Sequence, residues 1–251
     1  MRRIKLTVAY DGTDFCGFQV QPGLRTVEGV LYDALKTLTG EELDLIGASR
    51  TDSGVHSYGN TVVFDTESTI PPERFHKAVN TKLPDDVKAI ASCEVAPDWH
   101  PRHTDCLKTY LYRADNAYVP DVINRRYAMH FPGRVDIGLM QEAAKYIEGE
   151  HDFTSFSNPQ SQILKNGGSA VRTIDHINVA GESGGIITIE VCGNGFLYNM
   201  VRIIAGTLLD VGTGRFKPGD IVKMLEARDR TRAGFTAEAK GLFLKQIIYK
   251  N

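Results

Sequence analysis

The stretch IKLTVAYDGT, residues 4–13, alternates apolar and polar side chains and then ends in a turn. Alternation of this kind indicates a half-buried strand, and Asp-Gly-Thr favours a chain reversal. Thr26 then precedes an apolar stripe at helical spacing, which ends at Gly40. Because threonine caps helix starts and glycine ends helices, the sequence predicts a strand followed by a helix.

The rest of the first hundred residues extends this order. Strands are predicted at residues 43–48, 60–65 and 87–95 from their apolar content. A second helix is predicted from Pro71 to about Leu83, since proline favours the first turn of a helix and Pro84 ends it. The resulting β-α-β-β-α-β order is that of a split β-α-β, ferredoxin-like unit.

The second half repeats the order loosely, without sequence identity to the first. We therefore predict an α+β protein with two ferredoxin-like/split βαβ halves, residues 1–100 and 101–251, that share a mostly antiparallel sheet with a catalytic cleft on one face. Irregular segments are expected at the rim of that cleft. The strands are predicted at 108–114, 172–179, 186–191 and 242–249, the helices at 137–147, 196–211 and 218–227, and the irregular segments at 98–106, 116–124 and 155–169.

Composition excludes several classes of protein. The longest uncharged apolar stretch, residues 203–209, is far too short to span a bilayer. The basic N-terminus alternates and turns early, which indicates a strand and not a signal peptide. The four cysteines include no Cys-x-x-Cys pair, so the sequence predicts lone thiols in a cytosolic protein and neither a zinc ribbon nor a disulfide scaffold. Histidine spacing suggests no metal site.

Charge is distributed unevenly along the chain. The 29 Lys and Arg against 31 Asp and Glu give a net charge of −2. Residues 201–251 nevertheless hold ten basic and five acidic residues, which makes that segment +5 and the remainder −7. A local basic face for nucleic acid is therefore compatible with an acidic chain, although a solvated helix surface explains the same charges.

The polar loop SRTDSGVHS, residues 49–57, places Arg50, Asp52 and His56 between two predicted strands. One interpretation is a turn in which the aspartate bonds its own backbone. The other is a carboxylate that an adjacent guanidinium keeps ionised, so that it acts as a nucleophile or stabilises a cation. An aspartic protease is disfavoured, because its two carboxylates share a proton, no second Asp-Ser/Thr-Gly exists, and Arg50 opposes the shared proton.

Two further segments combine polar groups with apolar surroundings. Alternation in KTYLYR, residues 108–113, puts Lys108, Tyr110 and Tyr112 on one strand face, as in any amphipathic strand. The glycine turn that opens GNGFLYNMVR, residues 193–202, leads into an apolar helix. The start of this helix either binds phosphate or only marks the change from strand to helix. Arg202 lies in an apolar run, which favours an anionic partner for its guanidinium.

Taken together, these segments resemble the tRNA pseudouridine synthase A family. The loop RTDSGVH, residues 50–56, is similar to the Arg-Thr-Asp-x-Gly-Val-His signature of that family, and the resemblance covers nearly the whole chain in order. The departures are Ser49 where glycine is usual, Pro101 within a usual His-Ala-Arg, and Glu238 in place of a usual proline. The other matching segments are residues 10–19, 108–112, 151–153, 171–174, 193–202 and 233–237.

The resemblance implies an isomerase, a tRNA pseudouridine synthase that converts uridine at positions 38, 39 and 40 of the anticodon stem-loop to pseudouridine without cofactor or metal. Asp52 is then the catalytic nucleophile. It adds to the ribose anomeric carbon, adds to the uracil ring, or acts by way of a glycal, and the sequence leaves these routes open. Tyr110 would border the flipped base and help move a proton, and Arg202 would pair with Asp52.

The resemblance also implies tRNA and a second copy of the chain as partners, in a cytoplasmic homodimer without membrane contact. A non-catalytic RNA-binding module is the competing class, and the intact Asp52, Tyr110 and Arg202 argue against it. The expected substrate-binding residues are Arg50, Arg102, Tyr110, Asn194, Phe196 and Leu197. Further candidates for phosphate contact are Arg2, Arg3, Arg125, Arg126 and the basic residues of 201–251.

Overall fold

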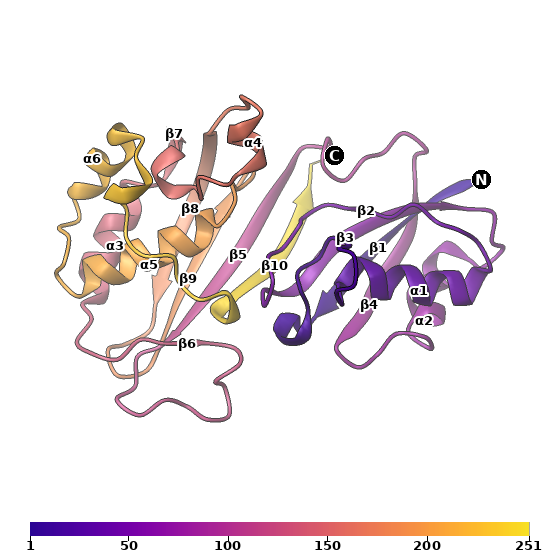
Figure 1. The fold of residues 1–251 in the computed structure, drawn as a ribbon, viewed down its shortest axis with the longest axis horizontal. Coiled ribbons are helices and arrows are strands. Elements are labelled where there is room, and N and C mark those ends of the chain that lie inside the picture. Colours follow the sequence, from indigo (N-terminus) through magenta and orange to yellow (C-terminus); the bar gives the residue numbers. More distant parts are fainter. Residues whose placement is uncertain (251) are drawn as a thin grey trace. The chain divides into compact units, whose positions relative to one another are not determined.

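A computed structural model describes residues 1–250 of the chain (Figure 1). These residues form two compact units. The first contains residues Met1–Cys106 together with the end of the chain from Phe243, and the second contains Leu107–Leu242. The final strand thus returns to the first unit, although it follows the second in sequence.

The sheet of the first unit is built on the N-terminal strand. β1 (Arg2–Tyr10) pairs antiparallel with both β3 (His56–Thr66) and β4 (Val87–Val95). The short β2 (Ile46–Gly47) pairs antiparallel with β3. β10 (Leu242–Tyr249) pairs with the start of β3 in parallel, with Phe243 opposite His56. The strand order within this unit is β4-β1-β3-β10.

Two helices complete the core of the first unit, α1 (Val27–Thr39) and α2 (Phe75–Val79). The Thr26 hydroxyl accepts a hydrogen bond from the Gly29 N–H at 3.3 Å, and Gly40 ends α1 at a φ of 76°. Both predicted caps of this helix are therefore confirmed. The core joins alternate residues of β1 to the apolar stripe of α1 and to α2: Ile4, Leu6, Val8, Leu31, Leu35, Phe75 and Val79.

The second unit has its own antiparallel sheet, with the order β5-β9-β8-β7. β5 (Cys106–Asp115) pairs antiparallel with β9 (Ile186–Gly193), and β9 with β8 (Val171–Ala180). β7 (Gly149–Asp152) pairs antiparallel with β8. The short β6 (Met129–His130) pairs in parallel with β5.

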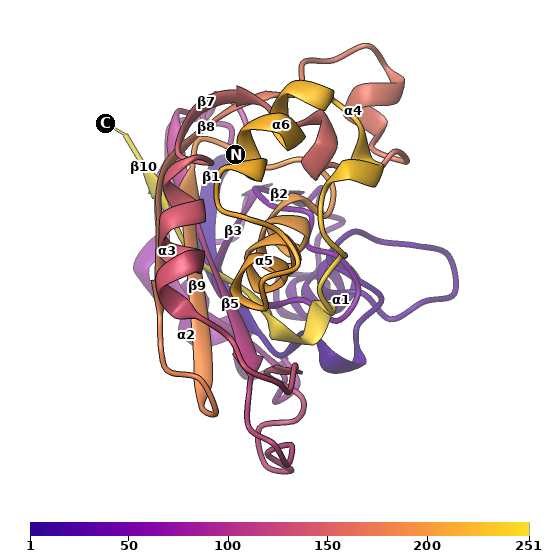
Figure 2. The same ribbon diagram turned by 90° about the vertical axis from the view of Figure 1, so that its left-hand side faces the viewer.

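The helices of the second unit are α3 (Ile137–Lys145), α4 (Gln162–Lys165), α5 (Met200–Gly212) and α6 (Asp220–Ala227). Figure 2 shows α3, α5 and α6 grouped beside β8 and β9. Every residue of α5 except Arg202 is buried. A Cβ on Gly212 would lie 2.9 Å from the Met140 side chain, so α5 and α3 pack closely at this glycine.

The predicted α+β class with mostly antiparallel strand pairs is confirmed within each unit. Two elements are much shorter than predicted. The 43–48 strand pairs only at residues 46–47, where Gly47 makes room for the ring of Phe18. The 71–83 helix reduces to a 3-10 turn and α2, because the Asn80 side chain bonds the backbone of Ala89 twice at 2.8 Å.

The start of the apolar helix in the second unit was wrongly predicted. The sequence predicts a start at Phe196, whereas α5 begins at Met200. The preceding residue, Asn199, has a left-handed φ of 61°, which no helix continues through. β6, β7 and α4 were not predicted, while residues 116–124 lack helix and strand as expected. The ferredoxin-like halves, the shared sheet and the cleft stay predictions.

Among residues 1–250, helices with the length and apolar character of a membrane span do not occur.

Candidate active site

Asp52 lies in a tight turn between β2 and β3. The Val55 N–H closes this turn on the Asp52 carbonyl at 3.1 Å, and Gly54 adopts a φ of 76° that favours glycine. Thr51 and Val55 are buried, whereas Asp52 is partly exposed. The turn is therefore anchored through the buried neighbours of Asp52, while Asp52 itself stays partly accessible to solvent.

The segment after β1 holds this turn in place. The Phe18 N–H donates to the Thr51 carbonyl at 3.0 Å. The Phe15 carbonyl accepts from the Gly54 N–H at 3.3 Å and from the Ser53 hydroxyl at 3.1 Å. Hydrogen bonds thus reach both sides of Asp52 from residues 15–18, and they fix its backbone. The resemblance had marked residues 10–19 as a matching segment without assigning them this role.

Close backbone contact reinforces the arrangement at Gly12. A Cβ at this position would lie 2.1 Å from the Val55 carbonyl oxygen, so only glycine lets the two segments approach. The Asp-Gly turn that follows the first strand therefore also packs against the Asp52 turn.

A buried network of polar side chains supports the segment that leads into the turn. The Asn60 side chain accepts from the Ser49 N–H at 3.2 Å and donates to the Ser49 carbonyl at 2.8 Å. It also donates to the Tyr10 hydroxyl at 3.3 Å, which lies 2.7 Å from the Thr51 hydroxyl. Burial raises the pKa of Tyr10 to about 12, so its phenol stays neutral at ordinary pH. Asn60 thereby links the strand β3 to both ends of the 49–51 segment.

Substitution of Asn60 by alanine is expected to lower the free energy of unfolding by about 2–4 kcal/mol, because it leaves the buried Ser49 N–H and carbonyl without their partner. Urea unfolding measures this loss, and turnover is expected to fall as the Asp52 turn loosens. Asn178→Ala, at an exposed position on β8, is the matched control. Equal stability of the two variants would contradict the supporting role.

Arg50 and Arg102 are two cations of the first unit whose charges act on one another. Desolvation, and next the positive charge of Arg50, lower the pKa of Arg102, while Glu28 acts in the opposite direction. An anion such as a phosphate that contacts both guanidinium groups would offset this repulsion. Sequence reasoning named both residues as substrate-binding, but it gave no sign that their charges act on one another.

Arg2 and Arg3 have partners within the fold. The Arg3 guanidinium makes an ion pair with Asp65 at 2.6 Å and donates to the Trp99 carbonyl at 3.0 Å. This hydrogen-bonded pair lowers the pKa of Asp65. Arg2 donates to the carbonyls of Ser68 and Ile70. These contacts give both arginines a role in stabilising the first unit.

Tyr110 is buried on β5 in the second unit and meets the ring of Phe196 edge to face, with the ring centroids 5.1 Å apart. Phe196 is only partly buried. Two aromatic faces are therefore held at a fixed angle, which suits a stacking site for a base. The two residues come from segments that sequence reasoning singled out separately.

The 193–199 turn is tied to β8. The Asn194 N–H donates to the Thr173 carbonyl at 3.1 Å, and its side chain accepts from the Thr173 N–H at 3.0 Å. Asn194 is exposed and Leu197 is buried, so the substrate-binding role assigned to Leu197 stays a prediction. Because α5 begins only at Met200, the glycine turn is not the helix start at which phosphate binding was considered.

Arg202 lies in the first turn of α5, where the helix dipole disfavours a cation. Its Nε donates to the Ala237 carbonyl at 2.7 Å, and its Nη1 donates to the Asn199 side chain at 3.1 Å. The Ala237 N–H in turn donates to the Arg202 carbonyl at 3.1 Å. These bonds orient the guanidinium within the second unit. Asp52 belongs to the first unit, and its pairing with Arg202 stays a prediction.

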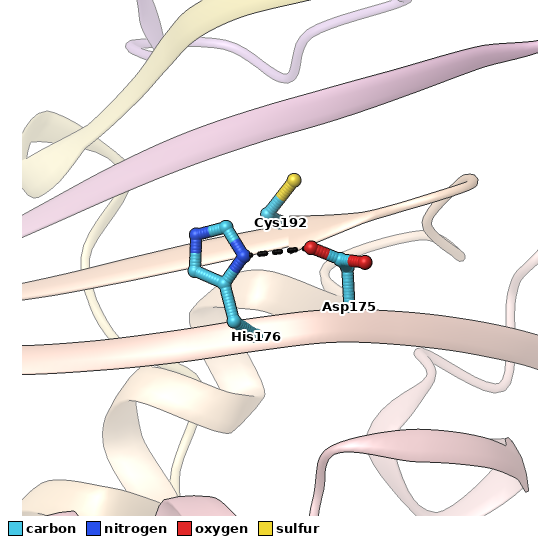
Figure 3. Close-up of side chains that lie close together, drawn as sticks. All are labelled: Asp175, His176 and Cys192. Carbon is cyan, nitrogen blue, oxygen red and sulfur yellow. Dashed lines mark hydrogen bonds and ion pairs between the residues drawn. The ribbon is translucent and has the colours of Figure 1, made fainter.

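One cluster was missed by sequence reasoning. Asp175 and His176 on β8 and Cys192 on β9 bring one possible ligand atom each to within 4.8 Å of the others (Figure 3). Spacing rules for metal sites search along one segment, whereas these residues meet across a strand pair. Only the register between β8 and β9 brings the three residues together, and spacing rules do not include strand register.

Comparison with known proteins agrees with the motifs. Residues 6–103 and 143–250 match the family model described as tRNA pseudouridine synthase, ranges that contain Asp52 and Arg202 and flank Tyr110. The chain is similar to tRNA pseudouridine synthase A of Caldicellulosiruptor saccharolyticus, with 45% identity over 249 residues, and to that of Bacillus licheniformis, with 44% over 251. In each case the match covers 99% of this chain and 100% of the relative.

Proposed function

The chain belongs to the tRNA pseudouridine synthase family, and from that membership we propose that it converts uridine to pseudouridine at positions 38, 39 and 40 in the anticodon stem-loop of tRNA. The name of its relatives, tRNA pseudouridine synthase A, supports an isomerase that acts on tRNA. The observation that carries the proposal is the partly exposed Asp52 on a turn braced by residues 15–18.

The reaction is an isomerisation whose atoms balance without a second substrate. The bond from uracil N1 to the ribose anomeric carbon breaks, and a bond from uracil C5 to the same carbon forms. The proton on C5 leaves to solvent, and N1 gains one. No electrons are transferred to an outside acceptor, so the chain's own acid, base and nucleophile suffice for the chemistry.

We assign Asp52 as the nucleophile, Arg202 as the cation that keeps Asp52 ionised and oriented, and Tyr110 as the residue that borders the base. The hydrogen bonds of Arg202 to Ala237 and Asn199 support the second role, because they hold the guanidinium in one direction. The edge-to-face contact with Phe196 supports the third.

The arginine pair of the first unit fits the RNA backbone. A stem uridine must leave its stack to be reached, and phosphate contacts hold the strand while the base is extruded. Arg50 lies two residues from Asp52, and the effect of its charge on Arg102 supports a site in which both guanidinium groups face one phosphate.

Arg50→Ala and Arg102→Ala are each expected to weaken tRNA binding and to reduce the slope of log affinity against log salt by about one, since each removes a phosphate contact. Filter binding across a salt series measures both effects. Lys82→Ala, at an exposed position after α2, is the control and should leave the slope unchanged. If affinity and slope stay at the values of the unsubstituted protein, neither arginine contacts the backbone.

Turnover is expected to survive dialysis against EDTA, because no step above uses a metal. The measurement compares initial rates for treated and untreated enzyme with the same refolded tRNA. A rate abolished by the chelator and restored by zinc alone, with the folded fraction unchanged, would show that the chemistry requires a bound ion.

We also propose a cytoplasmic homodimer. Exposed apolar side chains on the loop after β5 support a partner-binding surface, since exposed apolar groups that gather on one segment are suited to contact a partner. They are Tyr118, Val119, Val122 and Ile123. A second chain would also add basic residues around one tRNA. Sedimentation of the full chain measures its oligomeric state. A monomer at the concentrations used in the activity assay would contradict the proposed homodimer.

The activity itself is tested with unmodified tRNA that carries tritium on C5 of uridine. Formation of the new bond at C5 releases tritium to water, so the proposal expects release in proportion to the pseudouridine formed. An RNA-binding module without catalysis would bind the same tRNA and release none.

A further inference from the structure

The cluster of Asp175, His176 and Cys192 lies where β8 departs from regular pairing. Ile174 is opposite Gly193 and His176 is opposite Cys192, so two steps along β8 match one step along β9. Asp175 is the extra residue of this bulge. Neighbouring residues of a regular strand point to opposite faces, but a bulge redirects a side chain, and here Asp175 and His176 lie together (Figure 3).

The three side chains offer sulfur, nitrogen and oxygen to one point. The His176 Nδ1 and the Asp175 carboxylate are 2.8 Å apart, and the Cys192 sulfur is within 4.8 Å of a ligand atom of each. Thiolate, imidazole and carboxylate are the ligands that zinc takes in proteins, and three of them leave a fourth tetrahedral position for water. We propose that this cluster binds one divalent transition-metal cation of the zinc class.

The exposure of the ligands suits such a site. Cys192 is 4% exposed and fixed in the sheet, where the Thr109 hydroxyl lies 3.6 Å from its sulfur. The side chains of Asp175 and His176 are 56% and 48% exposed, so they can close onto an ion that enters from solvent. Binding replaces the thiol proton, which passes to the buffer, and involves no redox change.

The site lies on the other face of the sheet from the aromatic pair. Thr109 is opposite Cys192 and Tyr110 is opposite Val191, and neighbouring positions on β5 face opposite sides. The metal ion therefore stabilises the fold and does not contact the reacting base. It clamps β8 to β9 one residue before the 193–199 turn, whose Asn194 already bonds Thr173 of β8.

The test uses the full chain freed of metal by a chelator. Calorimetric titration with zinc chloride should show one equivalent bound, and cobalt should give the near-ultraviolet charge-transfer band of a thiolate ligand. Zinc should also raise the unfolding temperature, because it binds the folded state. Absence of stoichiometric binding, or cobalt binding without the thiolate band, overturns the proposal.

Variants locate the site. His176→Ala and Asp175→Asn change exposed side chains and should keep the fold, yet each should weaken zinc binding by more than about tenfold. Cys192→Ser should also remove the thiolate band. Cys93→Ser, which changes an exposed cysteine of the first unit, is the control and should bind as the unsubstituted chain does. If His176→Ala retains full affinity, or Cys93→Ser loses it, the ion binds elsewhere and the proposal fails.

Discussion

Asp52→Asn is expected to fold and to bind tRNA while turnover falls by more than about 1,000-fold, as for loss of a nucleophile in other enzymes. An amide has the shape of the carboxylate but neither its charge nor its nucleophilicity at neutral pH. The turn itself should persist, because the hydrogen bonds of residues 51–54 to Phe15 and Phe18 use the backbone and the Ser53 hydroxyl, not the Asp52 carboxylate.

Tritium release under single-turnover conditions, with enzyme in excess over tRNA, measures this effect apart from binding. Asp14→Asn makes the same chemical change at a nearby exposed position and should leave the rate unchanged. A rate for Asp52→Asn within tenfold of the unsubstituted enzyme would contradict the role of Asp52 as nucleophile.

Arg202→Lys is expected to lower the single-turnover rate by about 10- to 100-fold, with a smaller effect on tRNA affinity. Lysine keeps the charge but cannot bond Ala237 and Asn199 while also presenting a planar fork to a carboxylate. Misplacement by about 1 Å costs on the order of 100-fold in a positioned site. Arg202→Met should be slower still, and its rate should rise toward higher pH, where the carboxylate ionises without a cation beside it.

The pH and salt dependence of the single-turnover rate separates this role from phosphate binding. A phosphate contact at Arg202 would give variants that bind tRNA weakly, show a smaller salt slope and react at the normal rate once saturated. Arg134→Lys, at an exposed position of the second unit, is the control. The pattern of weak binding with a normal rate would contradict the proposed pairing.

Sequence reasoning succeeded where a local signal decides the structure. α1 begins after Thr26 and ends at Gly40, as predicted, because capping depends on single residues. The position of Asp52 in a turn before β3 followed from Asp-Ser-Gly between apolar runs. These features need no knowledge of distant contacts.

It failed where the structure depends on contacts that the sequence does not display. The left-handed Asn199 delays α5, although the apolar pattern continues through it. The bond pattern of Asn60 arises from burial beside Ser49, and an asparagine in a predicted strand gives no sign of this. The Asp175, His176 and Cys192 cluster depends on a bulge, which shifts the register across two strands.

The central claim is tested most directly by mapping pseudouridine in an unmodified tRNA after incubation with the protein, using carbodiimide adducts and primer extension. With uridine at positions 38, 39 and 40, we expect new stops at these positions that are absent with Asp52→Asn. Stops only outside the anticodon stem-loop, or no stops under conditions where the protein binds tRNA, would contradict it.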